Sequence, residues 1–119
     1  MEGFMRNDKE NLIVKMTFEF ALDIIKYSEH LEEQKKFIVA RQILRSGTSI
    51  GANVVEAQNA ESKQDFIHRM KIAAKEADET DYWLRLCEFS ESFPTDKALQ
   101  EKLLSVRNIL SKIISTSKK

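Results

Sequence analysis

The stretch Arg45-Ser-Gly-Thr-Ser-Ile-Gly-Ala-Asn-Val-Val-Glu-Ala57 lies inside a long helical pattern, yet it contains two of the three glycines in the chain. Gly47 and Gly51 each destabilise a helix interior by roughly 1 kcal/mol relative to alanine. Ser46 and Asn53 add smaller penalties, because their side chains compete for backbone hydrogen bonds. Small residues are favoured where another helix backbone approaches closely. We therefore predict that residues 45–57, here called the glycine segment, form the surface around which the other helices pack.

Length and composition predict one helical domain over residues 1–119. A chain of 119 residues can bury one substantial core. It is 42% hydrophobic and 32% charged, and it has a single proline. So few helix breakers over this length favour long helices over a loop-rich or disordered chain.

Charge and cysteine content narrow the function classes. Nineteen basic and nineteen acidic residues leave no net charge, which argues against strong non-specific binding to nucleic acid or anionic membranes. The lone Cys87 excludes an internal disulfide and fits a reducing compartment. No apolar run has the length of a signal core or a membrane span. We predict a cytoplasmic protein without a membrane segment.

Periodic apolar residues predict four helices, at about residues 8–30, 35–59, 63–91 and 96–115. Asn7 and Glu10 form a capping box before the first helix, and Ser62 caps the third. Pro94 ends the third helix and Thr95 caps the fourth. Short connections between amphipathic helices predict an all-α, up-down-up-down four-helix bundle.

The second helix is predicted to be continuous through the glycine segment, with two shorter helices meeting near Gly47–Gly51 as the alternative. If the following turn centres on residues 60 and 61, Gly47 lies opposite Ala74 in the antiparallel third helix. A small residue would then face another small residue across the two helices. The predicted buried stripe comprises Phe37, Ala40, Ile43, Leu44, Gly47, Ile50, Gly51, Val54 and Val55. The same register brings Arg41 and Arg45 near the acidic residues Glu76, Asp78, Glu79 and Asp81.

The glycine segment, together with residues 62–66 and 73–84, resembles one known family. Its members are four-helix-bundle proteins encoded in intervening sequences of bacterial large-subunit ribosomal RNA genes, related to accessory proteins of diversity-generating retroelements. The resemblance implies a protomer that assembles into a ring-like homopentamer and has no known catalytic activity. Relatives commonly carry proline at Gly51 and glycine at Ala57. The retroelement branch is basic and binds nucleic acid, whereas this chain is neutral.

No catalytic or metal-binding constellation emerges. Asp65 and His68 have the spacing of one half of a di-iron motif, but a complete site needs a second such pair. Glu76 and Glu79 could hold Mg²⁺ in a nucleotide hydrolase; salt bridges to Arg45 explain them better. Cys87 lies on an apolar stripe, as a small hydrophobe does. We predict a non-enzymatic protein without a cofactor or small-molecule substrate.

Two kinds of surface remain as candidate sites. Apolar residues beyond one stripe per helix indicate self-association: Ile72 and Tyr82 lie off the stripe of the third helix, and the second helix carries both Val54 and Val55. The predicted packing and assembly residues are Arg45, Ser46, Gly47, Gly51, Asn53, Glu56, Ala74, Glu76, Tyr82 and Trp83. Lysine clusters could contact RNA or DNA in the alternative function, a nucleic-acid-binding accessory protein, although solvated helix surface is the simpler interpretation. The lysines singled out are Lys35, Lys36, Lys71 and Lys75.

Overall fold

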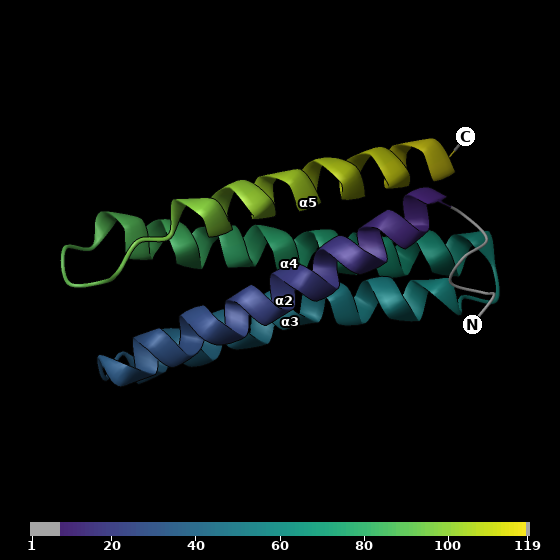
Figure 1. Ribbon diagram of the computed structural model, residues 1–119. Coiled ribbons are helices and arrows are strands. Elements are labelled where there is room, and N and C mark those ends of the chain that lie inside the picture. Colours follow the sequence, from purple (N-terminus) through teal and green to yellow (C-terminus); the bar gives the residue numbers. More distant parts are fainter. Residues whose placement is uncertain (1–7, 119) are drawn as a thin grey trace.

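The computed structural model describes the backbone of residues 8–118 and the side chains of residues 12–118. Its helices are α2 (Asp8–Glu33), α3 (Phe37–Gln58), α4 (Lys63–Phe89) and α5 (Lys97–Ser117). They run alternately up and down, and the start of α2 and the end of α5 lie at the same end of an elongated molecule (Figure 1). The described chain measures 45 × 26 × 21 Å. The predicted all-α, up-down-up-down four-helix bundle is confirmed.

The turn between α2 and α3 depends on one residue with left-handed backbone. Lys35 has φ of 63°, and it is the only non-glycine residue in the described part of the chain with positive φ. The Lys36 amide then donates to the Leu31 carbonyl over 2.9 Å, which closes the end of α2. The helix therefore runs to Glu33, beyond the expected end at residue 30.

Side-chain caps fix the starts of α4 and α5. The Ser62 hydroxyl accepts from the Asp65 amide over 3.0 Å, as predicted. The prediction of Thr95 as the cap of α5 was wrong, because Asp96 occupies that position and accepts from the Leu99 amide over 2.9 Å. A carboxylate caps as well as a hydroxyl, so the neighbouring residues could not be separated by type alone. The capping box expected at Asn7 and Glu10 lies outside the described side chains.

The core consists of one apolar stripe from each helix, and the loop between α4 and α5 is tied to it. Buried Tyr27 of α2 donates its hydroxyl to the Pro94 carbonyl over 2.7 Å. Cys87 is also buried. The fully buried large side chains include Ile13, Phe20, Ile24, Leu31, Ile43, Ile50, Val54, Met70, Leu99, Leu103, Val106 and Leu110.

Helix α3 is the central element, because it packs extensively on both α2 and α4. It continues unbroken through Gly47 and Gly51, so the alternative of two shorter helices is not observed. The prediction that Phe37, Leu44 and Val55 are buried was wrong, since all three are exposed. At 100° per residue these side chains fall at the outer edge of α3, beyond the arc that faces the core.

Within residues 8–118, no helix combines the length and the hydropathy required to cross a lipid bilayer.

Candidate assembly surfaces around the glycine segment

Gly47 and Gly51 let α3 approach α2. A Cβ atom at Gly47 would lie 2.7 Å from Cγ1 of Ile24, and one at Gly51 would lie 3.2 Å from Oγ1 of Thr17. The predicted close packing at the two glycines is therefore present. The prediction that Gly47 faces Ala74 of α4 was wrong. Ala74 instead lines a groove between α4 and α5. The Ser46–Thr80 hydrogen bond places Gly47 at the level of residue 79, so the predicted register was displaced by about one turn. Gly47 also projects toward α2 rather than toward α4.

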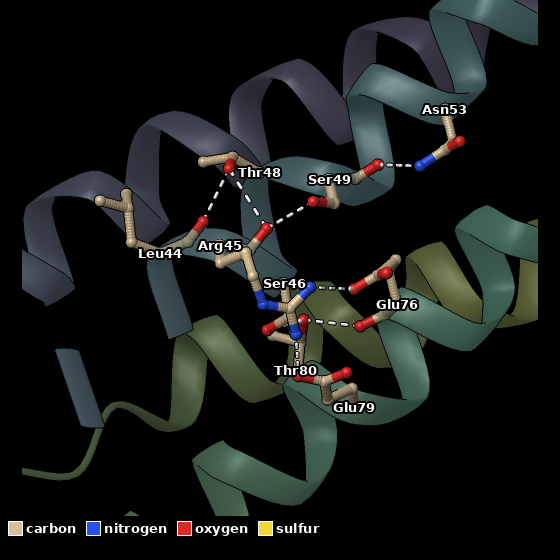
Figure 2. A network of polar contacts seen from close by, with 9 residues as sticks. All are labelled: Leu44, Arg45, Ser46, Thr48, Ser49, Asn53, Glu76, Glu79 and Thr80. Atoms are coloured by element: carbon tan, nitrogen blue, oxygen red, sulfur yellow. Dashed lines mark hydrogen bonds and ion pairs between the residues drawn. The ribbon is translucent and has the colours of Figure 1, made fainter. Parts of the chain in front are cut away.

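Most polar side chains of the glycine segment bond to their own helix (Figure 2). The Thr48 hydroxyl donates to the Leu44 carbonyl over 2.6 Å, and the Ser49 hydroxyl donates to the Arg45 carbonyl over 2.6 Å. The Asn53 amide nitrogen donates to the Ser49 carbonyl over 2.9 Å. Such local bonds satisfy the polar groups without a partner from another helix. These residues are therefore compatible with a helix interior that is part of a packed bundle.

Ser46 is the exception, because it is buried against α4. The hydroxyls of Ser46 and Thr80 are hydrogen-bonded over 2.9 Å, and both side chains are fully buried. Thr80 also bonds to the Glu76 carbonyl over 2.7 Å. A buried polar pair that is mutually satisfied fixes the register between two helices without leaving an unpaired group.

Arg45 continues the α3–α4 contact at the surface, as predicted. One guanidinium nitrogen lies 3.2 Å from a Glu76 carboxylate oxygen, and the other pairs with Glu79 (Figure 2). The hydrogen bond to Glu79 is the main cause of the raised pKa of Arg45. The expected approach of Asp78 and Asp81 to the arginines of α3 was wrong: both pair with Arg107 of α5 instead. They project from the opposite side of α4.

Other predicted residues take separate places. Glu56 pairs with Arg69 of α4 over 2.9 Å, near the end of α3. Tyr82 and Trp83 form an edge-to-face pair with ring centroids 6.2 Å apart. Trp83 packs against the core, whereas Tyr82 is 58% exposed. Tyr82 is therefore available for a contact that the described chain does not make.

The four predicted lysines do not form one site. Lys35 and Lys36 lie in the α2–α3 turn, and the Lys36 ammonium sits 4.9 Å above the ring centroid of Phe93. Lys71 and Lys75 lie on the exposed side of the first half of α4. Because α3 and α4 are antiparallel, the second pair lies toward the opposite end of the bundle from the first (Figure 1).

An apolar surface that sequence reasoning did not locate spans α2 and α3. A hollow of about 440 Å³ lies over Gly51, and Phe18 beside it is 65% exposed. We call this the groove surface, and its residues are Val14, Phe18, Ile25, Leu44, Gly51 and Val55. The exposed apolar residues of α2 follow its outer edge at helical spacing, a signal that was present in the sequence but was indistinguishable from a wide core stripe.

A second apolar surface lies at the C-terminal end of α4. Phe89 is 80% exposed and Ile38 is 77% exposed. The pairing of Ser46 with Thr80 places Ile38, two turns earlier on α3, at the level of residue 88, between Leu86 and Phe89. We call this the knob surface, and its residues are Ile38, Tyr82, Leu86 and Phe89.

The titratable residues considered as catalytic or metal-binding groups do not come together in one site. Asp65 lies in the first turn of α4 and approaches Arg69 to 4.0 Å, whereas His68 is exposed. Burial raises the pKa of the Cys87 thiol, which disfavours its nucleophilic thiolate form. Across residues 12–118, no group of three or more His, Cys, Asp or Glu side chains is arranged to hold a metal ion.

Comparisons with known proteins agree with this architecture. The chain is similar over 90% of its length to a crystal structure from Bacteroides thetaiotaomicron, described as a protein of unknown function from the S23 ribosomal protein family. The two share 41% identity with a TM-score of 0.84, and the match covers 98% of that chain. No curated protein matches the sequence. A family described as 23S rRNA-intervening sequence protein matches residues 9–115, nearly the whole chain. The protein therefore belongs to the 23S rRNA-intervening sequence protein family.

Proposed function

We propose that this protein is a non-enzymatic, self-assembling scaffold whose primary partner is another copy of itself. The observation that carries the proposal is the pair of apolar surfaces, groove and knob, that the described chain leaves in contact with solvent. Scattered exposed hydrophobic residues are normal on a protein surface, but contiguous ones mark interaction sites. Each surface combines residues from two adjacent helices, so each depends on the folded bundle.

The exposed area is large enough to matter energetically. A buried aromatic side chain removes about 150–250 Å² from water. At the observed exposures, Phe18 and Phe89 together present roughly 200–350 Å² that association could bury. At about 25 cal/mol per Å², this is a driving force of several kcal/mol before the entropy of association is subtracted. The aliphatic neighbours on both surfaces add to it.

The polar residues support a structural role over a catalytic one. Glu76 and Glu79, the carboxylates suited to Mg²⁺, both pair with Arg45. Arg45 therefore offsets part of the negative charge that would bind a cation and occupies carboxylate oxygens of both residues. Cys87 is the single cysteine of the chain and is a free thiol, which fits a reducing compartment, and we propose on this ground that the assembly is cytoplasmic.

For the stoichiometry we propose the five-membered ring that the family resemblance implies. Cyclic assemblies of identical subunits need an interface that leaves no complementary surface unpaired. Two surfaces on one protomer meet that requirement.

A charge placed in the groove surface tests the scaffold proposal. Val55→Glu should lower the native mass measured by light scattering, because burying an unpaired carboxylate in an apolar contact is strongly unfavourable. Leu104→Glu is the matched control, since Leu104 is a 55% exposed leucine on α5 outside both surfaces. Loss of mass in Val55→Glu alone supports the proposal. An unchanged mass in both variants would argue that the groove surface has no part in assembly.

Nucleic-acid binding is the second candidate, and the lysines near the α4–α5 groove favour it. The groove is lined by Asn108, Ser111, Ser115 and Lys118, the residue types that contact phosphate. Ala74 also lines the groove, and the exposed residues Lys71 and Lys75 lie three positions before it and one position after it on α4. Within residues 12–118 these lysines form no ion pair. A local basic patch can attract a phosphate backbone although the whole chain is neutral.

Titration of labelled structured RNA at increasing salt tests this candidate. Binding through Lys71 and Lys75 should weaken linearly in log affinity against log salt. Reversing both charges to glutamate should reduce that slope by about one for each phosphate that the protein no longer neutralises. The control reverses Lys35 and Lys36, at the other end of the bundle, and should leave binding unchanged. Equal weakening in both double variants, or no binding at low salt, would reject the α4–α5 site.

A further inference from the structure

We propose that the knob surface of one copy docks into the groove surface of the next, so that the chain assembles head to tail. This inference rests on the self-assembly proposed above and names its two contacting faces. The occupant of the groove is thus a second copy of this chain, and Phe89 is the side chain that enters the hollow.

The groove is shaped to receive an apolar side chain. It is lined by Gly51 and Ala52, which contribute little side chain, and by the apolar side chains of Phe18 and Val55. The hollow of about 440 Å³ exceeds the volume of one aromatic side chain. Thr17 and Thr48 also line it, but their hydroxyls donate to carbonyls of their own helices over 2.8 and 2.6 Å. Their hydrogen-bonding capacity is therefore met before a partner arrives.

The knob is shaped to enter such a hollow. Phe89 is the last residue of α4 and the most exposed large apolar side chain in the described part of the molecule. Leu86 and Tyr82 lie one and two turns before it on the exposed side of α4. Together they make an exposed apolar ridge, and Ile38 of α3 lies at the level of residue 88, between Leu86 and Phe89.

Only a heterologous contact covers both surfaces with one kind of interface. Groove against groove would oppose two hollows and leave Phe89 in water, and knob against knob would leave Phe18 exposed. The two surfaces cannot meet within one protomer, because Arg41 and Arg45 lie between them on the outer side of α3. Docking of the knob surface into the groove surface buries both apolar surfaces in one kind of interface.

The position of the surfaces is compatible with a ring. The groove surface spans α2 and α3, and the knob surface spans α3 and α4, so they occupy adjacent sides of the bundle. Each added copy is therefore rotated relative to the one before it, and the proposed ring forms where this rotation closes after five copies. Charge agrees with this pairing, since Lys15 lines the groove and exposed Glu91 follows Phe89 by two residues.

The exposed apolar area suits the centre of an interface. Standard protein interfaces bury about 800 Å² on each partner, with an apolar centre and a polar rim. The two knob aromatics, Phe89 and Tyr82, alone expose roughly 200–350 Å². With Ile38 and Leu86 they can supply the apolar centre of such an interface, and Lys15 and Glu91 lie at its rim.

A mixing experiment tests the head-to-tail contact. Phe18→Glu blocks the groove surface and keeps the knob, whereas Phe89→Glu blocks the knob and keeps the groove. Each variant alone should be monomeric by light scattering at high micromolar concentration. A mixture of the two should give a one-to-one heterodimer and nothing larger, because the only intact knob and the only intact groove are then used. Leu104→Glu should keep the mass of the unmodified protein, and circular dichroism should find all variants helical.

The outcomes separate this inference from the scaffold proposal. A mixture that stays monomeric overturns the head-to-tail contact. Retention of the full mass by Phe89→Glu, with a lower mass in Phe18→Glu, would mean that grooves pair with grooves; self-assembly would stand and the inference would fail. A monomeric unmodified protein would remove both. If Phe18→Glu is poorly helical, Val55→Glu replaces it as the groove-blocked partner in the same mixture.

Discussion

Gly47 of α3 lies directly against Ile24 of α2, so closely that an added Cβ would be 2.7 Å from Cγ1 and 2.8 Å from Cγ2 of the isoleucine. Ile24 is completely buried and surrounded by core residues. A close-packed interior gives such a side chain little room to move aside. This contact explains why α3 carries a glycine at mid-helix.

Gly47→Ala should lower the free energy of unfolding by about 1–3 kcal/mol, because overpacking outweighs the helix-propensity gain of about 1 kcal/mol. Urea unfolding followed by circular dichroism measures the change. Gly51→Ala is the matched control. Its Cβ would meet Thr17 at 3.2 Å, a milder contact, so its stability should change by less than about 1 kcal/mol.

A double-mutant cycle attributes the effect to the named pair. In an Ile24→Ala background the space for a Cβ at Gly47 is open, so Gly47→Ala should no longer destabilise the protein. An equal destabilisation in both backgrounds would place the cause elsewhere than in the contact with Ile24.

Tyr27 should make stability depend on alkaline pH. Burial, followed by the hydrogen-bonded neighbour Cys87, raises the pKa of its hydroxyl well above the ordinary 10.0. The folded protein therefore keeps a proton that the unfolded chain releases. The resulting stabilisation is complete below pH 10.0 and is lost as the pH rises from there through the folded-state pKa.

Urea unfolding of the unmodified protein and of Tyr27→Phe, from neutral pH to about pH 11, tests this linkage. The variant should be about 1 kcal/mol less stable at neutral pH, because the Pro94 carbonyl loses its donor. The difference should shrink above pH 10.0. A constant difference in unfolding free energy across the pH range would show that Tyr27 does not control the loss of stability at alkaline pH.

Lys35→Gly should stabilise the protein. A non-glycine residue in the left-handed region is disfavoured by about 1–2 kcal/mol, and glycine adopts that conformation freely. We expect a gain of up to about 1 kcal/mol in unfolding free energy after the greater entropy of the unfolded glycine is subtracted. Gln34→Gly, at a residue without positive φ, should give no gain. Equal effects at both positions would refute this account of the turn.

The sequence predicted the helices well because their periodicity is long and their breakers are few. It also located Arg45 opposite Glu76, since an antiparallel turn fixes the axial level. It did not predict that Gly47 faces Ile24. The position of the turn indicates how far along the bundle a residue lies, but not the direction in which its side chain projects around the helix axis. Apolar residues at the edges of stripes posed the same problem. Val55 belongs to an exposed surface, yet its spacing is that of a core residue.

The candidate site was predictable in kind but not in position. Surplus apolar residues indicated self-association, and Tyr82 was correctly singled out as lying off the core stripe. Phe18, Ile38 and Phe89 were missed because exposure depends on where each helix meets its neighbours. Among the basic residues, the lysine clusters could be identified from the sequence.

Sedimentation velocity of the purified, unmodified protein over a range of concentrations tests the central claim most directly. The protomer has a mass of 13.8 kDa. Self-assembly through the two apolar surfaces predicts one dominant species at a multiple of that mass, five in the proposed ring, which dissociates only on dilution. A species of 13.8 kDa at every concentration would contradict the account, because both apolar surfaces would then remain exposed in the native protein.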